Sequence, residues 1–370
     1  MKRIKVMTIF GTRPEAIKMA PLILELKKRK NEFDPIVTVT AQHREMLDQV
    51  LEIFKITPDY DLNIMKQKQT LVEITNRTLE GLDKIMKETK PDIVLVHGDT
   101  STTFAASLAA FYNQISIGHV EAGLRTWNKY SPYPEEMNRQ LTGVMADLHF
   151  APTEKSKQNL LNENKQEDRI FVTGNTAIDA LKTTVDPSYS HPILENIGNR
   201  RLVLVTAHRR ENLGENMHQM FRAIHRLVDT HEDIHVVYPV HLNPVVQQTA
   251  DEILGDHDRI QLIKPLDVID FHNFLAKSHL ILTDSGGIQE EPPSLGVPVL
   301  VLRDTTERPE GIEAGTLKLA GTEENTIFNL ANELLTNEEE YKKRAQAKNP
   351  YGDGEASRRI ADEIFNYFRS

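Results

Sequence analysis

The chain has 370 residues, of which 39% are hydrophobic and 26% are charged, and its 44 Lys and Arg against 54 Asp and Glu give a net charge of −10. This size favours two or three globular domains, and the acidic surplus argues against nucleic acid or an acidic membrane as a partner. The absence of cysteine excludes disulfides and thiolate chemistry and predicts a reducing, cytoplasmic location. We expect neither a signal peptide nor a membrane span, because no apolar run is long enough.

Short apolar runs alternate with amphipathic stretches along the whole chain, which predicts parallel sheets covered by helices on both faces. The first series of predicted strands is 5–10, 36–40, 93–97, 116–120, 148–151 and 170–173. The second series is 202–206, 234–240, 261–263, 280–283 and 297–302. The predicted helices include 15–28, 71–88, 102–112, 215–228 and 355–368.

The segment 183–200 separates the two series and lacks any periodicity, so we place the domain hinge near it. We predict an α/β chain with two Rossmann-like, doubly wound domains, 1–175 and 176–354. Ligands of such sheets bind beyond the carboxyl ends of the strands. We therefore expect the functional site in a cleft between the two domains.

A first candidate for phosphate binding follows the first predicted strand. Gly11 permits a tight turn, Pro14 suits the start of a helix, and Arg13 and Lys18 add positive charge there. A helix N-terminus favours phosphate. An ordinary strand–helix turn with solvated charges explains the same residues equally well.

A second candidate follows the predicted strand 280–283. Ser285, Gly286 and Gly287 would let the backbone approach a phosphate, and Glu290 or Glu291 in the helix expected next would accept hydrogen bonds from a ribose. The alternative is a capped helix with a charged face. His208, Arg209 and Arg210 end another predicted strand, and we assign His208 a functional role because it shares the predicted cleft.

Three acidic residues are expected near the same crevice. Asp99 and Glu121 follow neighbouring strands, and Glu135 or Glu136 opens a helix behind Pro134. Adjacent helical residues point about 100° apart, so only one of the two glutamates is expected to face the site. When carboxylates share a pocket, burial and mutual repulsion shift their pKa values apart, so one can donate a proton while another accepts one.

The sequence indicates neither a metal nor a dinucleotide cofactor. His231–His235 has the spacing of a zinc motif, but it spans a predicted helix end and strand start, where its histidines share no helical face. The first strand is not followed by a GxGxxG motif, so NAD is not indicated.

Together these stretches closely resemble the bacterial non-hydrolysing UDP-N-acetylglucosamine 2-epimerases over essentially the whole chain. The matching segments are 10–18, 41–44, 97–100, 118–126, 134–136, 208–211, 284–291, 306–310 and 349–354. The resemblance implies a GT-B-like fold whose last helix, 355–370, packs back on the first domain. It also implies a homodimer that interconverts UDP-GlcNAc and UDP-ManNAc by eliminating and re-adding UDP, with no NAD or metal.

The resemblance also implies roles for individual residues, which we carry over position by position. Asp99, Glu121 and Glu135 would be the acid–base carboxylates, and His208 would assist the departing UDP. The residues implied in substrate and UDP binding are Arg13, Lys18, Arg139, Ser285, Gly286, Gly287 and Glu291.

Bacterial members of this family share an activator site for UDP-GlcNAc. Gln42, Arg209 and His241 match that site, whereas Glu45 and Lys68 stand where some members carry Gln and Arg. Three alternatives remain open: a glycosyltransferase that needs an acceptor, a hydrolysing epimerase that releases free ManNAc, and a nucleotide-sugar sensor without activity.

Overall fold

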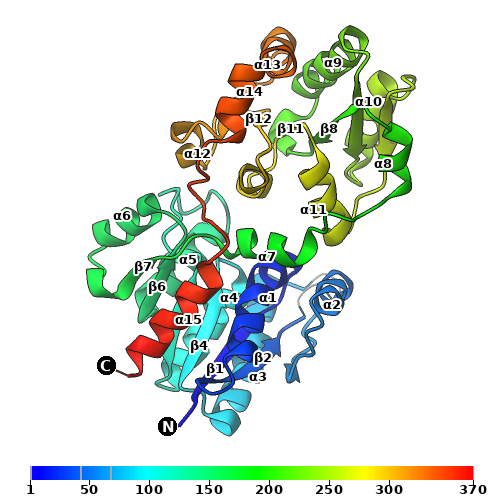
Figure 1. Cartoon of the computed structure of the whole chain (residues 1–370). Helices are drawn as coiled ribbons and strands as arrows, with labels where there is room; N and C mark the ends of the chain where they lie inside the picture. Colours follow the sequence, from blue (N-terminus) through cyan, green and yellow to red (C-terminus); the bar gives the residue numbers. More distant parts are fainter. Residues whose placement is uncertain (1, 42–43, 67–68, 370) are drawn as a thin grey trace. The chain divides into compact units, whose positions relative to one another are not determined.

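The structure is a computed structural model that describes residues 2–41, 44–66 and 69–369. It divides into unit 1, Met1–Thr183 with Tyr351–Ser370, and unit 2, Thr184–Pro350. Each unit is a parallel sheet with helices packed around it (Figure 1), which confirms the predicted α/β class. Within the described ranges, no helix is long and apolar enough to cross a membrane.

Unit 1 has a 7-stranded sheet in the order β3-β2-β1-β4-β5-β6-β7, with every neighbouring pair parallel. Its strands are β1 Ile4–Phe10, β2 Phe33–Val39, β3 Tyr60–Asp61, β4 Ile93–His97, β5 Ser116–Val120, β6 Leu148–Ala151 and β7 Ile170–Val172. Its helices are α1 Arg13–Lys28, α2 Arg44–Ile53, α3 Leu71–Thr89, α4 Ser101–Tyr112, α5 Glu135–Met145, α6 Glu154–Asn162, α7 Thr176–Thr184 and α15 Ala356–Tyr367, with the 3₁₀ turn η1 Glu167–Arg169. The central strands β1, β4 and β5 are buried along almost their whole length because helices cover both faces.

Unit 2 repeats the arrangement with a 6-stranded parallel sheet in the order β10-β9-β8-β11-β12-β13. Its strands are β8 Arg201–Thr206, β9 Ile234–Pro239, β10 Ile260–Ile263, β11 Leu280–Thr283, β12 Val299–Val301 and β13 Leu317–Leu319. Its helices are α8 Pro192–Ile197, α9 Glu215–Thr230, α10 Pro244–Leu254, α11 Val268–Lys277, α12 Pro309–Glu313, α13 Glu324–Thr336 and α14 Glu338–Ala345, with the 3₁₀ turns η2 Arg210–Asn212, η3 Gly287–Gln289 and η4 Pro292–Leu295.

The last helix, α15, belongs to unit 1 and lies beside α1 (Figure 1). Its Ile360, Ala361 and Ile364 are buried in the same apolar cluster as the α1 side chains. The boundary between the two units lies near the end of α7, after Thr183, which is later than the predicted boundary at residue 175. Most of α7 stays in unit 1 because it is hydrogen-bonded to α15. The Asp179 carboxylate accepts the Ser357 backbone N–H at 2.7 Å.

The segment after β11 differs from the sequence prediction. We expected a helix carrying Gln289, Glu290 and Glu291, but the chain forms two short 3₁₀ turns, η3 and η4. Pro292 and Pro293 begin η4. Proline lacks an N–H and disfavours helical backbone in the residue before it, so an α-helix cannot run through this stretch.

Candidate active site

Both sheets place polar residues at the point where the strand order reverses. In unit 1, β1 and β4 are neighbours, and Gly11 and Gly98 follow them. In unit 2, β8 and β11 are neighbours, and Ala207 and Asp284 follow them. Doubly wound sheets bind ligands at this switch point. The predicted candidate residues therefore fall into two groups, one in each unit.

The buried Glu15 side chain stabilises the turn after β1. Its Oε2 accepts the backbone N–H of Gly11 at 3.0 Å and of Thr12 at 2.8 Å, and its Oε1 accepts the Thr100 hydroxyl at 2.8 Å. Glu15 thus joins the turn after β1 to the start of α4. This role of Glu15 was not predicted from the sequence, although the Thr12–Glu15 spacing is that of a capping box. Arg13, the first residue of α1, is partly exposed.

Glu121 lies directly after β5 with a positive φ of 60° and is surrounded by donors. It forms an ion pair with Lys18, which the sequence analysis had assigned to phosphate or sugar. Asn175 Nδ2 donates to Glu121 Oε2 at 3.0 Å, and His97 Nε2 lies 3.4 Å from the same oxygen. Burial alone would raise the pKa of Glu121, but Lys18 and His97 hold that pKa well below its usual range.

Asp99 follows the neighbouring strand β4, as predicted, and its surroundings shift its pKa in the direction opposite to that of Glu121. Burial raises its pKa; Arg139 opposes the shift, while repulsion from Glu121 and Glu135 adds to it. Arg139 Nη2 lies 2.8 Å from Asp99 Oδ2. Two carboxylates on adjacent strands therefore have pKa values shifted in opposite directions, which is the usual arrangement of an acid–base pair.

The structure separates the roles of the two glutamates that open α5. Glu136 is fully buried and accepts the backbone N–H groups of Thr126 and Trp127 at 3.0 and 3.1 Å and the Gln140 side chain at 2.8 Å. The Glu135 side chain is partly exposed and makes no hydrogen bond or ion pair with the rest of the described chain. Glu136 thus holds the loop before α5, and Glu135 is available to a ligand.

This difference predicts different outcomes for two isosteric substitutions. Glu136→Gln is expected to destabilise the protein by about 1–3 kcal/mol, because its amide group would face backbone donors in a buried site. Glu135→Gln is the matched control and is expected to change the melting temperature little. Thermal unfolding of both variants measures the effect. Equal melting temperatures would contradict the structural role of Glu136.

In unit 2, a buried carboxylate organises the ends of β8 and β11. Asp284 accepts the backbone N–H of His208 at 3.0 Å and of Arg209 at 2.9 Å, and the side chain of Asn212 at 3.1 Å. Asp284 belongs to the matching segment 284–291, but no role was predicted for it from the sequence. Its contacts fix the backbone that carries His208 and Arg209.

The predicted phosphate-binding loop lies beside these residues. A Cβ built on Gly286 would lie 3.4 Å from Arg209 Nη2, so the end of the Arg209 side chain lies directly beside the loop. Gly287 is exposed and Ser285 is partly exposed. The structure therefore brings Arg209 to the glycine loop, although the sequence had placed Arg209 only in an activator site.

The two predicted histidines, His208 and His241, stack on each other with ring centroids 5.2 Å apart. Burial lowers the pKa of His208; Asp284 opposes this shift, whereas His241 and Arg209 add to it. The His208 imidazole is therefore neutral at neutral pH. A neutral imidazole can donate one hydrogen bond and accept another.

The glutamates after the glycine loop differ from each other. Glu290 is buried and forms an ion pair with Arg308. Glu291 is partly exposed, and its Oε2 lies 3.7 Å from His272 Nε2. Of the two predicted ribose ligands, Glu291 is thus the more accessible. Gln42 lies outside the described residues, as do Lys68 and the side chain of Glu45.

The residues 231–235 behave as the sequence predicted: α9 ends at Thr230 and β9 begins at Ile234, so the two histidines share no helix. In the described part of the chain, no group of three or more His, Asp or Glu side chains is placed to hold a metal ion.

The fold and the side chains define a class of protein. One Rossmann-like parallel sheet carries two carboxylates with opposite pKa shifts, and the other carries a glycine loop beside a histidine and an arginine. This combination is that of a GT-B-like α/β enzyme. The chain matches the family model for UDP-N-acetylglucosamine 2-epimerase over residues 25–365. It belongs to that family.

Three relatives show how close the similarity is. The UDP-N-acetylglucosamine 2-epimerase of Bacillus subtilis is 70% identical over 368 residues, which cover 100% of this chain and 97% of the relative. A Listeria monocytogenes crystal structure is 64% identical with a TM-score of 0.96, covering 100% of this chain and 97% of that one. The UDP-GlcNAc 2-epimerase of Neisseria meningitidis, solved with UDP-GlcNAc bound, is 51% identical with a TM-score of 0.88, covering 98% and 100%.

Proposed function

We propose that the chain interconverts UDP-GlcNAc and UDP-ManNAc by elimination and re-addition of UDP. A carboxylate takes the C2 proton as the bond from C1 to the UDP oxygen breaks, which leaves 2-acetamidoglucal and UDP. A second acid, whose proton comes from solvent, protonates the opposite face of C2 as the UDP oxygen bonds to C1 again, so atoms and charge balance. The observation that carries the proposal is the pair of neighbouring carboxylates with opposed pKa shifts, Asp99 and Glu121.

The pKa shifts support a division of labour in unit 1. Asp99, whose pKa is raised, is the group we assign to proton exchange at C2, because a general base works best when its pKa approaches the operating pH. Glu121 stays ionised beside Lys18 and stabilises positive charge that develops at C1. Glu135 lies close enough to Asp99 to influence its pKa, and we assign it to the return of the proton.

In unit 2 we assign the glycine loop and its neighbours to the leaving diphosphate. Ser285, Gly286 and Gly287 bind it, Arg209 adds positive charge, and neutral His208 donates a hydrogen bond to the departing oxygen. Glu291 is assigned to the ribose. The Neisseria meningitidis relative binds UDP-GlcNAc, which supports a nucleotide-sugar ligand here.

The reaction we propose moves a proton and a diphosphate and transfers no electrons, so it requires neither NAD nor a metal. Purified enzyme with UDP-GlcNAc, EDTA and no NAD is expected to form UDP-ManNAc, observed by proton NMR. Release of free ManNAc and UDP would instead indicate a hydrolysing epimerase. An unchanged spectrum despite binding would indicate a transferase that lacks its acceptor, or a sensor.

We also propose that UDP-GlcNAc acts as an activator through Arg209 and His241. Both residues adjoin the assigned diphosphate site: Arg209 faces Gly286, and His241 stacks on His208. A second ligand that contacts them would reposition groups of the active site directly. A rate that rises more steeply than hyperbolically with UDP-GlcNAc, and becomes hyperbolic in His241→Ala, would support this coupling.

The proposal includes a cytoplasmic homodimer that supplies ManNAc for cell-surface polysaccharide or teichoic-acid linkage units. The absence of cysteine fits a reducing compartment. Phe111 and Tyr112 are exposed together at the end of α4 and support association with a second copy. Light scattering during gel filtration measures the mass, and a monomer would contradict the dimer.

A further inference from the structure

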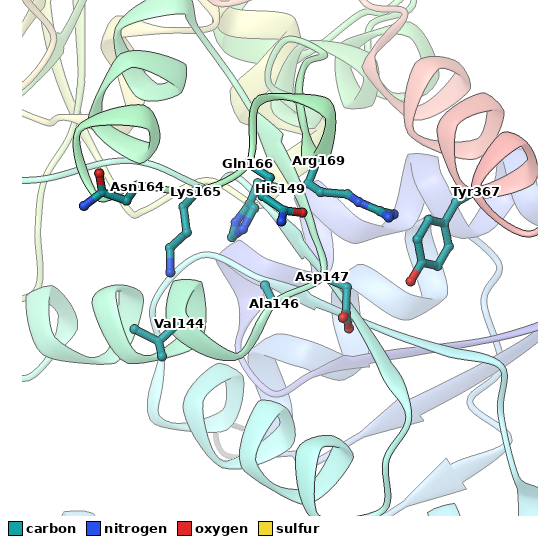
Figure 2. Close-up of a pocket in the computed structure, with 9 residues that line it drawn as sticks. All are labelled: Val144, Ala146, Asp147, His149, Asn164, Lys165, Gln166, Arg169 and Tyr367. Carbon is teal, nitrogen blue, oxygen red and sulfur yellow. The ribbon is translucent and has the colours of Figure 1, made fainter. Parts of the chain in front are cut away.

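Unit 1 has a hollow of about 300 Å³ at the amino ends of β6 and β7, and Figure 2 shows the residues that line it. The Arg169 guanidinium lies 4.9 Å from the centre of the Tyr367 ring and points away from Lys165 and His149 in Figure 2. The polar side chains of the hollow therefore do not converge on one ligand. In unit 2, by contrast, a buried histidine faces Glu291, the carboxylate that we assign to the ribose.

This histidine, His272, lies on α11 and is buried, with only 2% of its surface exposed. Its two ring nitrogens face two different segments of unit 2. Nδ1 lies 2.7 Å from the Thr184 hydroxyl oxygen, at hydrogen-bond distance, and Nε2 lies 3.7 Å from Glu291 Oε2. An imidazole side chain has no other polar atoms. The polar atoms of His272 are therefore directed at a hydroxyl on one side and at the Glu291 carboxylate on the other.

The Thr184 contact belongs to a set of hydrogen bonds that fixes the start of unit 2. Thr184 is the last residue of α7 and the first residue of unit 2. Asn273, the fully buried neighbour of His272 on α11, donates from Nδ2 to the Thr184 carbonyl oxygen at 2.8 Å and accepts the Asp186 backbone N–H at 2.9 Å. Because α11 contacts both the hydroxyl and the carbonyl group of Thr184, the imidazole is held in place with Nε2 opposite Glu291.

The backbone on both sides of Glu291 is fixed separately. Asn349 Nδ2 donates to the Glu290 carbonyl oxygen at 2.8 Å and to Ser294 Oγ at 2.5 Å. With the neighbouring backbone held in this way, the freedom that remains to Glu291 is in its side chain, which is the part that His272 faces. The Glu291 side chain is 14% exposed, so a ligand can still reach it.

We propose that His272 is a positioning residue, which holds the Glu291 carboxylate in place for the hydroxyl groups of the ribose. This inference rests on the assignment of Glu291 to the ribose in the proposed function. A carboxylate has about four acceptor positions on its two oxygens, so Oε2 can face His272 while the group accepts hydrogen bonds from a ribose. A glutamate side chain that is already ordered loses less conformational entropy when the ligand binds. The effect therefore falls on nucleotide affinity and on selectivity for ribose.

Calorimetry with UDP and with 2′-deoxy-UDP, which lacks one ribose hydroxyl, tests this role in the full chain. His272→Asn keeps a polar atom near the Nδ1 position for Thr184 but has none near Nε2, whereas His272→Gln places one near Nε2. We expect the preference of the wild type for UDP over 2′-deoxy-UDP to fall about three- to tenfold in His272→Asn, and His272→Gln to restore most of it. A loss of stability alone would weaken both ligands alike and leave the preference unchanged.

His231→Asn is the matched control, because it removes an imidazole that pairs with Asn332 elsewhere in unit 2, and its preference should equal that of the wild type. If Glu291→Gln loses the preference and His272→Asn keeps it, the positioning role is overturned. An unchanged preference in Glu291→Gln would overturn the ribose assignment itself, and with it the role of His272. If His272→Asn fails to fold, Thr184→Val takes its place: loss of the hydroxyl that fixes the ring should lower the preference, and an unchanged preference there would equally overturn the role.

Discussion

Asp99→Asn is expected to lower the turnover of UDP-GlcNAc by about 10²- to 10⁴-fold, the usual contribution of a positioned general base. Asparagine keeps the size of the side chain and an oxygen for Arg139, which lies 2.8 Å from Asp99, so the fold should be preserved. The affinity for UDP should change little, because the residues that we assign to the diphosphate and the ribose lie in unit 2. Steady-state kinetics and calorimetry with UDP measure the two quantities separately.

The control and the pH dependence make this prediction sharper. Asp92→Asn changes the carboxylate at the other end of β4, which accepts the Lys5 N–H at 2.7 Å, and should leave turnover nearly unchanged. A base must be ionised, and the Asp99 pKa is raised, so turnover should fall with decreasing pH at a midpoint above the ordinary value of about 3.9. An Asp99→Asn enzyme within about threefold of the wild-type rate would contradict the assignment.

Glu121→Gln is expected to damage both activity and stability. The Lys18 and Glu121 side chains are only 19% and 9% exposed. Removing one partner of a buried ion pair costs about 3–5 kcal/mol. Turnover should fall by at least about 10², because the developing charge at C1 loses its ionised neighbour. Thermal unfolding and kinetics on the same preparation report both effects.

A double variant separates the charge effect from general disruption. Lys18→Gln combined with Glu121→Gln removes both charges of the ion pair, so it should be more stable than the sum of the two single losses predicts. Its turnover should remain low, because neither charged group is restored. Additive losses of stability would show that the ion pair does not couple the two residues.

The sheets were predictable from sequence where short, largely apolar runs stand between helical stretches. The predicted strands 93–97, 116–120, 148–151 and 280–283 have the bounds found in the structure. The edge strands β3 and β13 were not predicted. Each is only two or three residues long, so neither produces an apolar run, and pairing with a neighbouring strand defines it.

The site was predictable as a set of motifs but not as a network. The sequence placed Asp99 and Glu121 at neighbouring strand ends, as the structure does. It could not show that Asn175 contacts Glu121, or that Glu15 contacts Thr100, because those pairs are 54 and 85 residues apart. The local pattern also left Glu135 and Glu136 equivalent, and only the family resemblance singled out Glu135. Their difference arises from the Thr126 and Trp127 backbone, which folds over Glu136 alone.

Proton exchange at C2 is the central claim, and NMR of the enzyme with UDP-GlcNAc in D₂O tests it most directly. We predict that UDP-ManNAc appears with deuterium at C2 and that the remaining UDP-GlcNAc gradually gains deuterium at the same carbon. Epimerised product that keeps its original C2 proton would contradict the proposed elimination and re-addition.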